Sequence, residues 1–449
     1  MTGRVHSLHD DALANTSYLV EIRLGQAIAI DPPRDIDAHL ALAKQLGVEI
    51  VAALDTHVHA DYVSGALELA AHGADAIVPD GASTKWPHRA VADDERVTVG
   101  DVTIHALATP GHTPEHLAYV LERNGVPVAV FSGGSLILGG AARTDLLGPA
   151  HTDELAHAQF RSLRRLASLP DETALYPTHG AGSFCLAAAT QITDATIGSE
   201  RVTNPLLAIE DEDKFVDALV AGFGTYPTYY RYLQAVNEAG APLVRMLPAP
   251  ELLTPDEAAN RVRDGAWLID ARPIHDWALA HPVGAISNEL RPAFASWLGW
   301  IVPFGAPVIL IVDDHDRGEA MRLARRIGYD DVAFLAGGID AWRDAGLPIA
   351  SVDELDAPRA HARVSGGAVL LDVRQDNEVE TLRIHGAEHV ELGALIAGAT
   401  PSGPEVIAFC GHGERSATAI SMLEQRGVRA ANLVGGTEAW IAAGLPVER

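Results

Sequence analysis

A repeat in the second half of the chain constrains its fold more than any other feature of the sequence. Asp270 and Asp372 lie in matching apolar segments, and the correspondence continues in the same order towards the C-terminus. The further matched pairs are Gly284-Ala285 with Gly386-Ala387, Glu289-Leu290 with Glu391-Leu392, Val308-Ile309 with Val406-Ile407, Gly337-Gly338 with Gly435-Gly436, and Trp342 with Trp440. So many matches in register predict two copies of one domain, at residues 251–350 and 355–449.

Each copy alternates short apolar strands with amphipathic helices. In the second copy, a strand at residues 406–409 precedes a helical stripe of Ala417, Ile420 and Leu423, with Gly427 as the expected helix end. The first copy repeats this pattern after a strand at residues 308–312. Alternation of this kind predicts an α/β fold in which helices cover a parallel sheet.

The first 247 residues have a different pattern and form a separate expected domain. Strands at residues 27–30 and 50–54 flank a helical stripe that Gly47 closes, and further strands are expected around residues 97–107, 117–121 and 126–131. Histidines recur at the strand ends. Pro248, Pro250 and Pro255 punctuate the passage to the first repeat and indicate a linker.

Charge and cysteine content exclude several classes of function. The chain has 449 residues and a formal net charge of −27, which repels nucleic acid and anionic membrane surfaces. Cys185 and Cys410 are the only two cysteines, too few for a disulfide framework. The N-terminal residues lack the apolar core of a secretory signal, and glycines and prolines interrupt the uncharged stretch at residues 292–312. We therefore expect a cytoplasmic protein with no membrane span.

Several histidines at strand ends are candidate metal ligands. His57 and His59 stand two residues apart directly after a strand, with Asp61 close behind them. His112 and His179 follow two later strands. Imidazoles that come together at the ends of strands can converge on one cation, so these residues predict a metal site.

These motifs resemble the metallo-β-lactamase superfamily, and within it the persulfide dioxygenase branch. The resemblance rests on the HxHxD motif and on these further segments: residues 30–35, 59–65, 180–185 and 196–198, and Asn204-Pro205. It implies an αββα sandwich that holds one iron(II) by two histidines and one aspartate. Carried over by motif, the histidine ligands fall on His57 and His112, and no organic cofactor is expected.

The chain departs from that family pattern at two positions. The family's ligand aspartate lies nine residues before an Arg-Thr-Asp motif, and here Gly134 occupies that position. Tyr62 replaces the last histidine of HxHxDH, so a dinuclear hydrolase is not expected. Two interpretations remain open: a degenerate site retained as scaffold, or an iron site in which another residue, such as His59 or Asp61, replaces the missing ligand, with His179 as a further candidate.

Cys410 lies at the end of an expected strand and begins a glycine-containing loop. Gly411 and Gly413 allow the backbone to turn its N–H groups inward, and a helix begins just beyond them. Both features stabilise a thiolate, and Arg415 adds a cation at the rim. The pattern predicts a nucleophilic cysteine held in an anion-binding loop.

The length of this loop resembles that of rhodaneses. Counting from Cys410 to Arg415 gives a loop one residue shorter than that of cysteine phosphatases, which suits a persulfide sulfur. The resemblance assigns Cys410 and Arg415 as catalytic and the remaining loop residues as substrate-binding: Gly411, His412, Gly413, Glu414 and Ser416. Val312 stands at the Cys410 position in the first copy, which therefore resembles an inactive rhodanese.

For two further parts of the first domain, the sequence leaves open whether the residues bind substrate or only pack. Cys185 is either a packed small apolar residue or part of a substrate channel. The segment Tyr226-Pro227-Thr228-Tyr229-Tyr230, with Asn237, either resembles the family's thiol-substrate segment or packs a helix as an aromatic cluster.

The domain order resembles persulfide dioxygenase–rhodanese fusions. The leading hypothesis is a sulfurtransferase in which Cys410 carries sulfane sulfur from thiosulfate, or from a persulfide of glutathione or another low-molecular-weight thiol, to a thiol or cyanide acceptor. Two alternatives are an active iron-dependent persulfide dioxygenase with a reorganised third ligand, and a non-catalytic persulfide carrier. By resemblance, we also expect a homo-oligomer.

Overall fold

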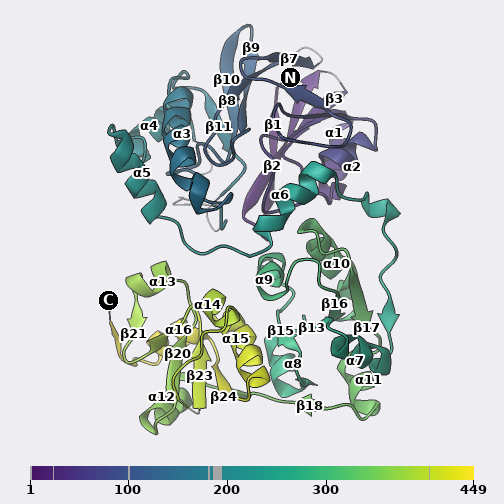
Figure 1. Cartoon of the computed structure of the whole chain (residues 1–449), viewed down its shortest axis with the longest axis vertical. Coiled ribbons are helices and arrows are strands. Elements are labelled where there is room, and N and C mark those ends of the chain that lie inside the picture. The colour runs from purple at the N-terminus through teal and green to yellow at the C-terminus, as the bar shows by residue number, and fades with distance from the viewer. Residues whose placement is uncertain are drawn as a thin grey trace. The chain divides into compact units, whose positions relative to one another are not determined.

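The computed structural model describes residues 3–23, 25–99, 102–180, 183–185, 195–403 and 405–448. The chain divides into two compact units (Figure 1). The first unit comprises residues 1–247 with 325–328, and the second comprises residues 248–324 with 329–449.

The first unit is built on two sheets that pack face to face. One sheet has the strand order β1 (Val5–Asp10), β2 (Asn15–Arg23), β3 (Gln26–Ile30), β4 (Glu49–Leu54), β5 (Asp75–Pro79) and β6 (Arg89–Val91). The other has the order β11 (Ala174–Pro177), β10 (Val126–Gly133), β9 (Leu117–Arg123), β8 (Val102–Ala108) and β7 (Arg96–Val99). Alternate apolar side chains from both sheets, such as Ile28, Ile104 and Phe131, form one buried core between them.

Helices cover the outer face of each sheet and complete four layers. The helices α1 (Asp37–Leu46) and α2 (Ala66–Ala70) pack on the first sheet. On the second sheet pack α3 (Pro149–Ala167), α4 (Ile197–Thr203) and α5 (Glu212–Ala221) (Figure 1). This arrangement confirms the expected αββα sandwich. The strand expected at residues 97–107 is instead a pair, β7 and β8, which run antiparallel.

The first repeat copy forms a five-stranded, fully parallel sheet. Its strand order is β12 (Leu252–Leu253), β17 (Val332–Leu335), β16 (Val308–Ile311), β13 (Trp267–Asp270) and β15 (Ile286–Ser287). Its helices are α7 (Pro255–Arg263), α8 (Ile274–Leu279), α9 (Phe294–Ile301), α10 (Arg317–Arg326) and α11 (Gly338–Asp344). The uncharged stretch at residues 292–312 thus divides into α9, which is buried along its whole length, and β16.

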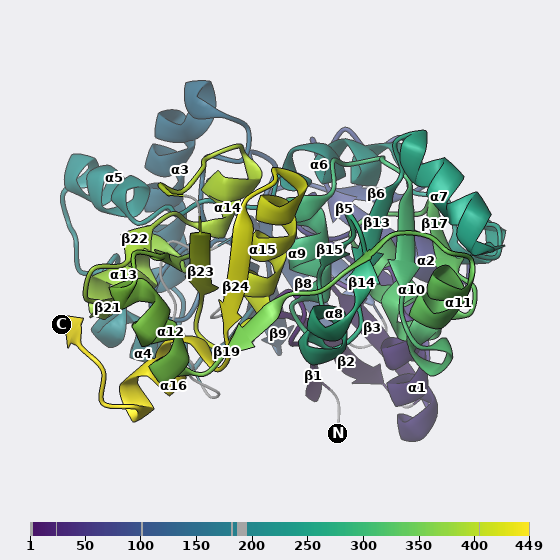
Figure 2. The ribbon, with the colours of Figure 1, turned by 90° about the horizontal axis from the view of Figure 1, so that it is seen from below.

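The second repeat copy has the same topology (Figure 2). Its parallel sheet has the order β19 (Asp353–Leu355), β24 (Arg429–Leu433), β23 (Glu405–Phe409), β20 (Val369–Asp372) and β22 (Glu388–His389). Its helices are α12 (Ala357–Ser365), α13 (Asp376–Thr381), α14 (Leu392–Ile396), α15 (Glu414–Gln425) and α16 (Gly436–Ala442). The prediction of two α/β domains with parallel sheets is confirmed.

Small antiparallel pairs complete the two repeat copies. In the first copy β14 (His281–Pro282) pairs with β18 (Ile349–Ala350), and in the second β21 (Arg383–Ile384) pairs with β25 (Val447–Glu448). Across all the residues that the structure describes, no helix is both long enough and apolar enough to cross a membrane.

Candidate functional site

The strand β23 ends at Phe409 and delivers Cys410 to the carboxyl edge of its sheet. The side chain of Cys410 is buried, and the N–H group of Gly413 donates to its Sγ atom at 3.1 Å. Gly413 reaches this position with a φ of 128°, a conformation that an L side chain rarely adopts. The sulfur therefore faces a main-chain donor at the start of α15 rather than packed hydrocarbon alone.

The glycine pair before α16 holds the backbone of Cys410 from the other side. Thr437 donates to the carbonyl oxygen of Cys410 through its N–H at 2.9 Å and through its hydroxyl at 3.0 Å. A Cβ atom at Gly436 would lie only 2.2 Å from that oxygen. Only glycine permits this approach, which fixes the position of the Cys410 main chain.

Arg415 lies beside the sulfur and is oriented by a residue that sequence analysis missed. Glu378, at the third position of α13, forms a two-pronged ion pair with Arg415, at 2.5 and 2.8 Å. Burial opposes ionisation of Arg415, but the Glu378 hydrogen bonds and the adjacent Cys410 sulfur raise its pKa. The capping-box spacing of Gln375 and Glu378 was a usable sequence signal for a helix start, but not for this pairing.

The remaining predicted loop residues differ in their surroundings. The Oε2 atom of Glu414 lies 4.0 Å from Cys410 Sγ, which places an acidic group beside the sulfur. The hydroxyl of Ser416 is buried, lies 3.9 Å from Sγ and donates to Asn432 Oδ1 at 2.8 Å. His412 is exposed at the rim and pairs with Glu438 at 3.1 Å.

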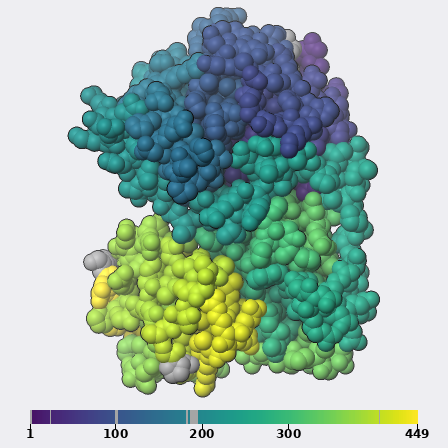
Figure 3. All heavy atoms as spheres, viewed as in Figure 1, coloured from purple at the N-terminus to yellow at the C-terminus, as the bar shows by residue number. Residues whose placement is uncertain are grey.

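The first copy clamps the helix that begins at this loop. The hydroxyl of Thr418 donates to the carbonyl of Ser287 at 2.7 Å, and Ser421 Oγ accepts from the Ser287 N–H at 2.9 Å. One turn further, Gln425 donates to the carbonyl of Gly284 at 2.7 Å. In the space-filling view the yellow surface of the second copy adjoins the green surface of the first (Figure 3). These contacts fix α15 against β15 along its length.

The equivalent loop of the first copy has no cysteine and a different conformation. Val312 stands after β16, and residues Asp314–Asp316 form a short 3₁₀ helix before α10. Arg317 pairs with Asp314 at 2.5 Å. Arg317, at the position equivalent to Arg415, is therefore engaged by one of the loop aspartates.

In the first unit, three histidines converge from separate loops. One ring nitrogen from each of His57, His112 and His179 lies within 4.8 Å of those of the other two, and all three side chains are buried. The Nε2 atoms of His57 and His179 are 3.4 Å apart. Burial lowers the pKa of His112 and of His179 to about 3 and that of His57 well below its ordinary value, so the three rings are neutral.

Hydrogen bonds fix which nitrogen each of these rings presents. Asp31 accepts the hydroxyl proton of Thr56 at 2.8 Å, so Thr56 Oγ1 accepts from His57 Nδ1 at 2.8 Å. His112 Nδ1 donates to the carbonyl of Arg143 at 2.8 Å, and His179 Nδ1 donates to Asn15 Oδ1 at 3.0 Å. Every Nε2 atom therefore keeps a free lone pair, as a metal ligand requires.

His59 belongs to a neighbouring group rather than to this cluster. Its Nε2 atom lies 3.2 Å from Asp31 Oδ1 and 3.1 Å from the hydroxyl of Tyr62, which stacks on its ring. Burial opposes protonation of His59, but Asp31 raises its pKa. Burial also raises the pKa of Asp55, whose Oδ1 atom lies 3.9 Å from the same His59 nitrogen, to about 7. His59 is thus held as an ion-pair partner of carboxylates.

Asp61 and Cys185 lie on the far side of His179. One ligand atom of each lies within 4.8 Å of the other and of a His179 nitrogen. Asn15 donates to one Asp61 oxygen at 2.6 Å, while the other oxygen is buried without a hydrogen bond. Burial raises the pKa of the Cys185 thiol, which contacts Tyr230. Ala181 and Gly182, which precede this cysteine in the quoted motif, lie outside the described residues.

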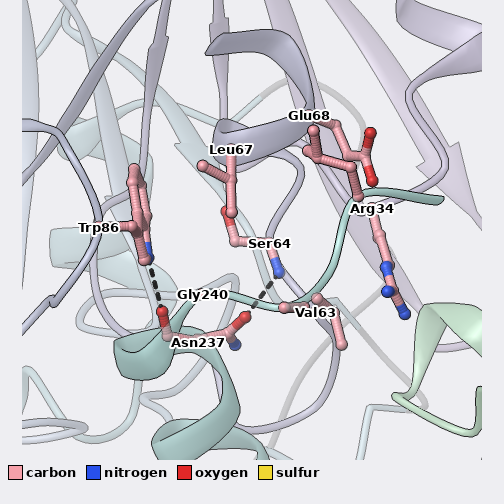
Figure 4. A pocket seen from close by; sticks show the side chains of 10 residues that line it. Arg34, Val63, Ser64, Leu67, Glu68, Trp86, Asn237 and Gly240 are labelled. Carbon is pink, nitrogen blue, oxygen red and sulfur yellow. Dashed lines mark hydrogen bonds between the residues drawn. The ribbon is translucent and has the colours of Figure 1, made fainter. Parts of the chain in front are cut away.

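Asn237 on α6 (Tyr230–Ala239) bonds to the loop that follows the histidines, and Figure 4 shows its hydrogen bonds to Ser64 and Trp86. Its side chain donates to the carbonyls of His59 and Tyr62 at 2.7 and 2.9 Å and accepts from the Ser64 N–H at 2.9 Å. Its carbonyl accepts from the indole of Trp86 at 2.9 Å. The Asn237 side chain is therefore saturated by the fold, which favours the packing interpretation of this segment.

Comparison with known proteins decides the family. Two segments, residues 254–345 and 351–443, match the rhodanese-like domain model. Over 202 residues, 43% of the chain, the sequence is 30% identical to the mitochondrial persulfide dioxygenase ETHE1 of Bos taurus and covers 72% of that relative. The chain belongs to the persulfide dioxygenase–rhodanese fusion family. These relatives link this fusion protein to sulfur metabolism.

Further similarities of the fusion protein concern its fold and its metal site. A metallo-beta-lactamase from Staphylococcus aureus subsp. aureus COL superposes with a TM-score of 0.69 at 28% identity, over 75% of this chain and 99% of that one. The hydroxyacylglutathione hydrolase of Rhodospirillum rubrum is 33% identical over 168 residues, which are 37% of this chain and 62% of that relative. With the His and Asp groups described above, these similarities indicate a metal-binding N-terminal domain.

Proposed function

We propose that the protein is a sulfurtransferase and that Cys410 is its nucleophile. One observation carries this proposal: the Gly413 N–H donates to Cys410 Sγ at the point where β23 ends and α15 begins. A main-chain donor and a helix N-terminus both favour a negative charge on this sulfur. The adjacent Arg415 supplies a cation for an anionic donor.

Sulfur transfer takes place in two steps, the loading of sulfur onto Cys410 and its transfer to an acceptor. The Cys410 thiolate attacks the outer sulfur of thiosulfate; a new S–S bond forms, the S–S bond of thiosulfate breaks, and sulfite leaves with its electron pair. With a persulfide donor, a thiolate leaves instead. The terminal sulfur of the Cys410 persulfide then passes to cyanide or to an acceptor thiolate, and the Cys410 thiolate is regenerated.

The neighbouring residues serve this chemistry through their charge and position. Arg415, held in place by Glu378, orients the donor through charge-assisted hydrogen bonds. The Gly413 N–H stabilises the sulfur anion at both stages. Ser416 Oγ is buried 3.9 Å from Sγ and places a hydroxyl group beside the sulfur.

Turnover of thiosulfate with cyanide tests the proposal directly. The full chain should form thiocyanate, and Cys410→Ser should abolish this, whereas the matched variant Cys185→Ser should leave it unchanged. Mass spectrometry of the full chain after donor addition should show one extra sulfur, which Cys410→Ser should lack. A wild-type chain that takes up sulfur without turnover would instead support the alternative of a persulfide carrier.

A second candidate function, persulfide oxidation in the N-terminal domain, is favoured by the convergence of His57, His112 and His179. These neutral imidazoles fit a divalent metal ion, and a bound iron(II) would supply the redox chemistry between dioxygen and a persulfide. The overall reaction converts a persulfide, O₂ and water into a thiol, sulfite and two protons. Oxygen uptake by the iron-loaded chain with glutathione persulfide tests this function, and an absence of uptake would exclude it.

A further inference from the structure

Three buried histidines of the first unit, His57, His112 and His179, bring one ring nitrogen each within 4.8 Å of those of the other two. Their Nδ1–H groups are all engaged by other acceptors, so the Nε2 atoms are the nitrogens that face one another. We propose that His57, His112 and His179 form a three-histidine centre for a divalent transition-metal ion, in which His179 supplies the third ligand that Gly134 cannot. This inference deepens the second candidate function, but its test does not depend on oxygen chemistry.

The separation of the nitrogens suits one shared ion. Two ligands at about 2.0–2.1 Å from a tetrahedral metal lie roughly 3.3 Å from each other. The Nε2 atoms of His57 and His179 are 3.4 Å apart, and the His112 ligand atom lies within 4.8 Å of both. The centroids of the three rings are 4.9 to 5.4 Å apart, so each imidazole contacts the other two. Without a cation, the facing lone pairs would repel one another.

The groups behind the ligands hold each ring in this orientation. Thr56 is itself fixed by Asp31, whose two carboxylate oxygens also accept from the Thr56 N–H at 2.7 Å and from the Thr178 hydroxyl. Asn15, which accepts from His179, donates in turn to Asp61 at 2.6 Å. A metal-ligating histidine almost always donates its other ring N–H to a fixed acceptor, as each of these three rings does.

Gly134 allows the His112 ring to occupy its present position. A Cβ atom built at Gly134 would lie 2.5 Å from Cδ2 and 2.9 Å from Cγ of His112. Any side chain there, an aspartate included, would force the ring to move. The position of His112 in the three-histidine cluster therefore depends on the absence of a side chain at residue 134.

Charge and ligand type define the ion that this centre takes. Neutral imidazoles suit Fe(II), Zn(II), Ni(II) and Cu(II) better than Mg(II) or Ca(II), which prefer oxygen ligands. Three neutral ligands leave the ion's two positive charges uncompensated. Asp61 places a buried carboxylate behind the His179 ring, with Oδ2 at 3.5 Å from Nδ1, and this charge offsets part of that of the ion.

Titration of the metal-free full chain with cobalt(II) tests the proposal, followed by metal analysis after dialysis. The wild-type chain should bind one cobalt ion, and His179→Gln should weaken binding by at least about 100-fold. The matched control His39→Gln changes a buried histidine of α1, outside the cluster, and should bind as the wild type does. Unchanged cobalt affinity in a folded His179→Gln variant, judged by circular dichroism, would overturn the proposal.

X-ray absorption on the cobalt-loaded wild-type chain gives a readout that needs no variant. Imidazole rings produce a recognisable outer-shell scattering pattern, and fitting it should return three histidines. A fit with two histidines and added oxygen ligands would contradict the assignment of His179. Failure of the wild-type chain to bind cobalt at all would contradict the centre as a whole.

Discussion

The two rhodanese-like copies have the same frame but different active loops. In each, an aspartate at the end of a central strand pairs with the arginine two residues later, Asp270 with Arg272 and Asp372 with Arg374. That arginine donates to a carbonyl eight residues further on, at 2.8 Å in both copies. The tryptophans Trp342 and Trp440 donate to matching proline carbonyls at 3.0 and 3.1 Å.

The loops that follow the equivalent strands, β16 and β23, differ in both sequence and contacts. One copy has Cys410 facing the Gly413 N–H, and the other has Val312 followed by a 3₁₀ turn rich in aspartate. In one, an arginine is aimed at sulfur by Glu378; in the other, an arginine is engaged by Asp314. The comparison shows that the residues that hold the fold together are not those of the active loop. A copy without the cysteine can therefore keep the same structure.

The largest expected effect comes from moving the cysteine between the copies. Cys410→Ser combined with Val312→Cys should remain inactive in thiocyanate formation, at least about 10³-fold below wild type, because the first copy has an aspartate-rich 3₁₀ turn after Val312 and its arginine pairs with an aspartate of that turn. The assay compares this double variant with Cys410→Ser alone. Recovered turnover would contradict the distinction between the two loops, because it would show that the acidic loop of the first copy can also support sulfur transfer.

Removing the partner of Arg415 should have the next largest effect. Glu378→Gln should lower kcat/KM for thiosulfate by roughly tenfold or more, because Arg415 loses its fixed orientation. Glu438→Gln, at the exposed rim, is the matched control. Equal kinetics for Glu378→Gln and wild type would show that Arg415 does not need this support.

The same ion pair should respond to acid. Burial opposes ionisation of Glu378, but Arg415 holds the pKa of that carboxyl below its ordinary value of 4.5. The contribution of the pair to stability is therefore fully present above that ordinary value and is lost as the pH falls through the lowered pKa. Urea unfolding from pH 7 to pH 3 should show a steeper acid loss in wild type than in Glu378→Gln.

A smaller effect is expected from removing a negative charge in the active loop. Glu414→Gln removes an acidic group 4.0 Å from Cys410 Sγ, so repulsion of the dianionic thiosulfate falls. The kcat/KM for thiosulfate should rise about threefold to tenfold relative to that for a less highly charged persulfide, most clearly at low ionic strength. A fall in the ratio of thiosulfate to persulfide turnover would contradict this electrostatic selection.

The smallest expected effect concerns the contact between the two copies. Ser421→Ala removes the acceptor of the Ser287 N–H and should lower the free energy of unfolding by about 1–2 kcal/mol. Sulfur transfer should fall only severalfold, because the loop itself is intact. Thermal unfolding and thiocyanate formation, measured on the same preparation, check both effects; activity unchanged despite lost stability would show that the clamp serves folding alone.

Much of this fold could be predicted from local patterns in the sequence. The repeat pairs fixed two parallel α/β copies, and the apolar periods located the main strands. The separate strands β7 and β8 were not distinguished because both belong to one apolar pattern in the sequence. The location of Cys410 at a strand end followed from the apolar run before it and the glycines after it.

The partners of the site residues could not be predicted in the same way. Glu378 lies 37 positions from Arg415, and Asn15 lies 164 positions from His179, so only the tertiary fold brings them together. From the sequence alone, His59, Asp61 and His179 were all candidates for the missing ligand. The hydrogen bonds that turn His59 towards Asp31 and His179 towards His57 depend on side-chain geometry, which no spacing rule contains.

The clamp on α15 has a consequence for any attempt to isolate the last repeat. Thr418 and Ser421 are buried hydroxyl groups whose partners are the main chain of Ser287. A fragment cut at the boundary between the copies would hydrate this helix flank and loosen the element on which the sulfur loop is mounted. The copy without a nucleophile therefore supplies main-chain hydrogen-bond partners for the helix of the copy that carries it, which is a structural reason to keep both in a single polypeptide.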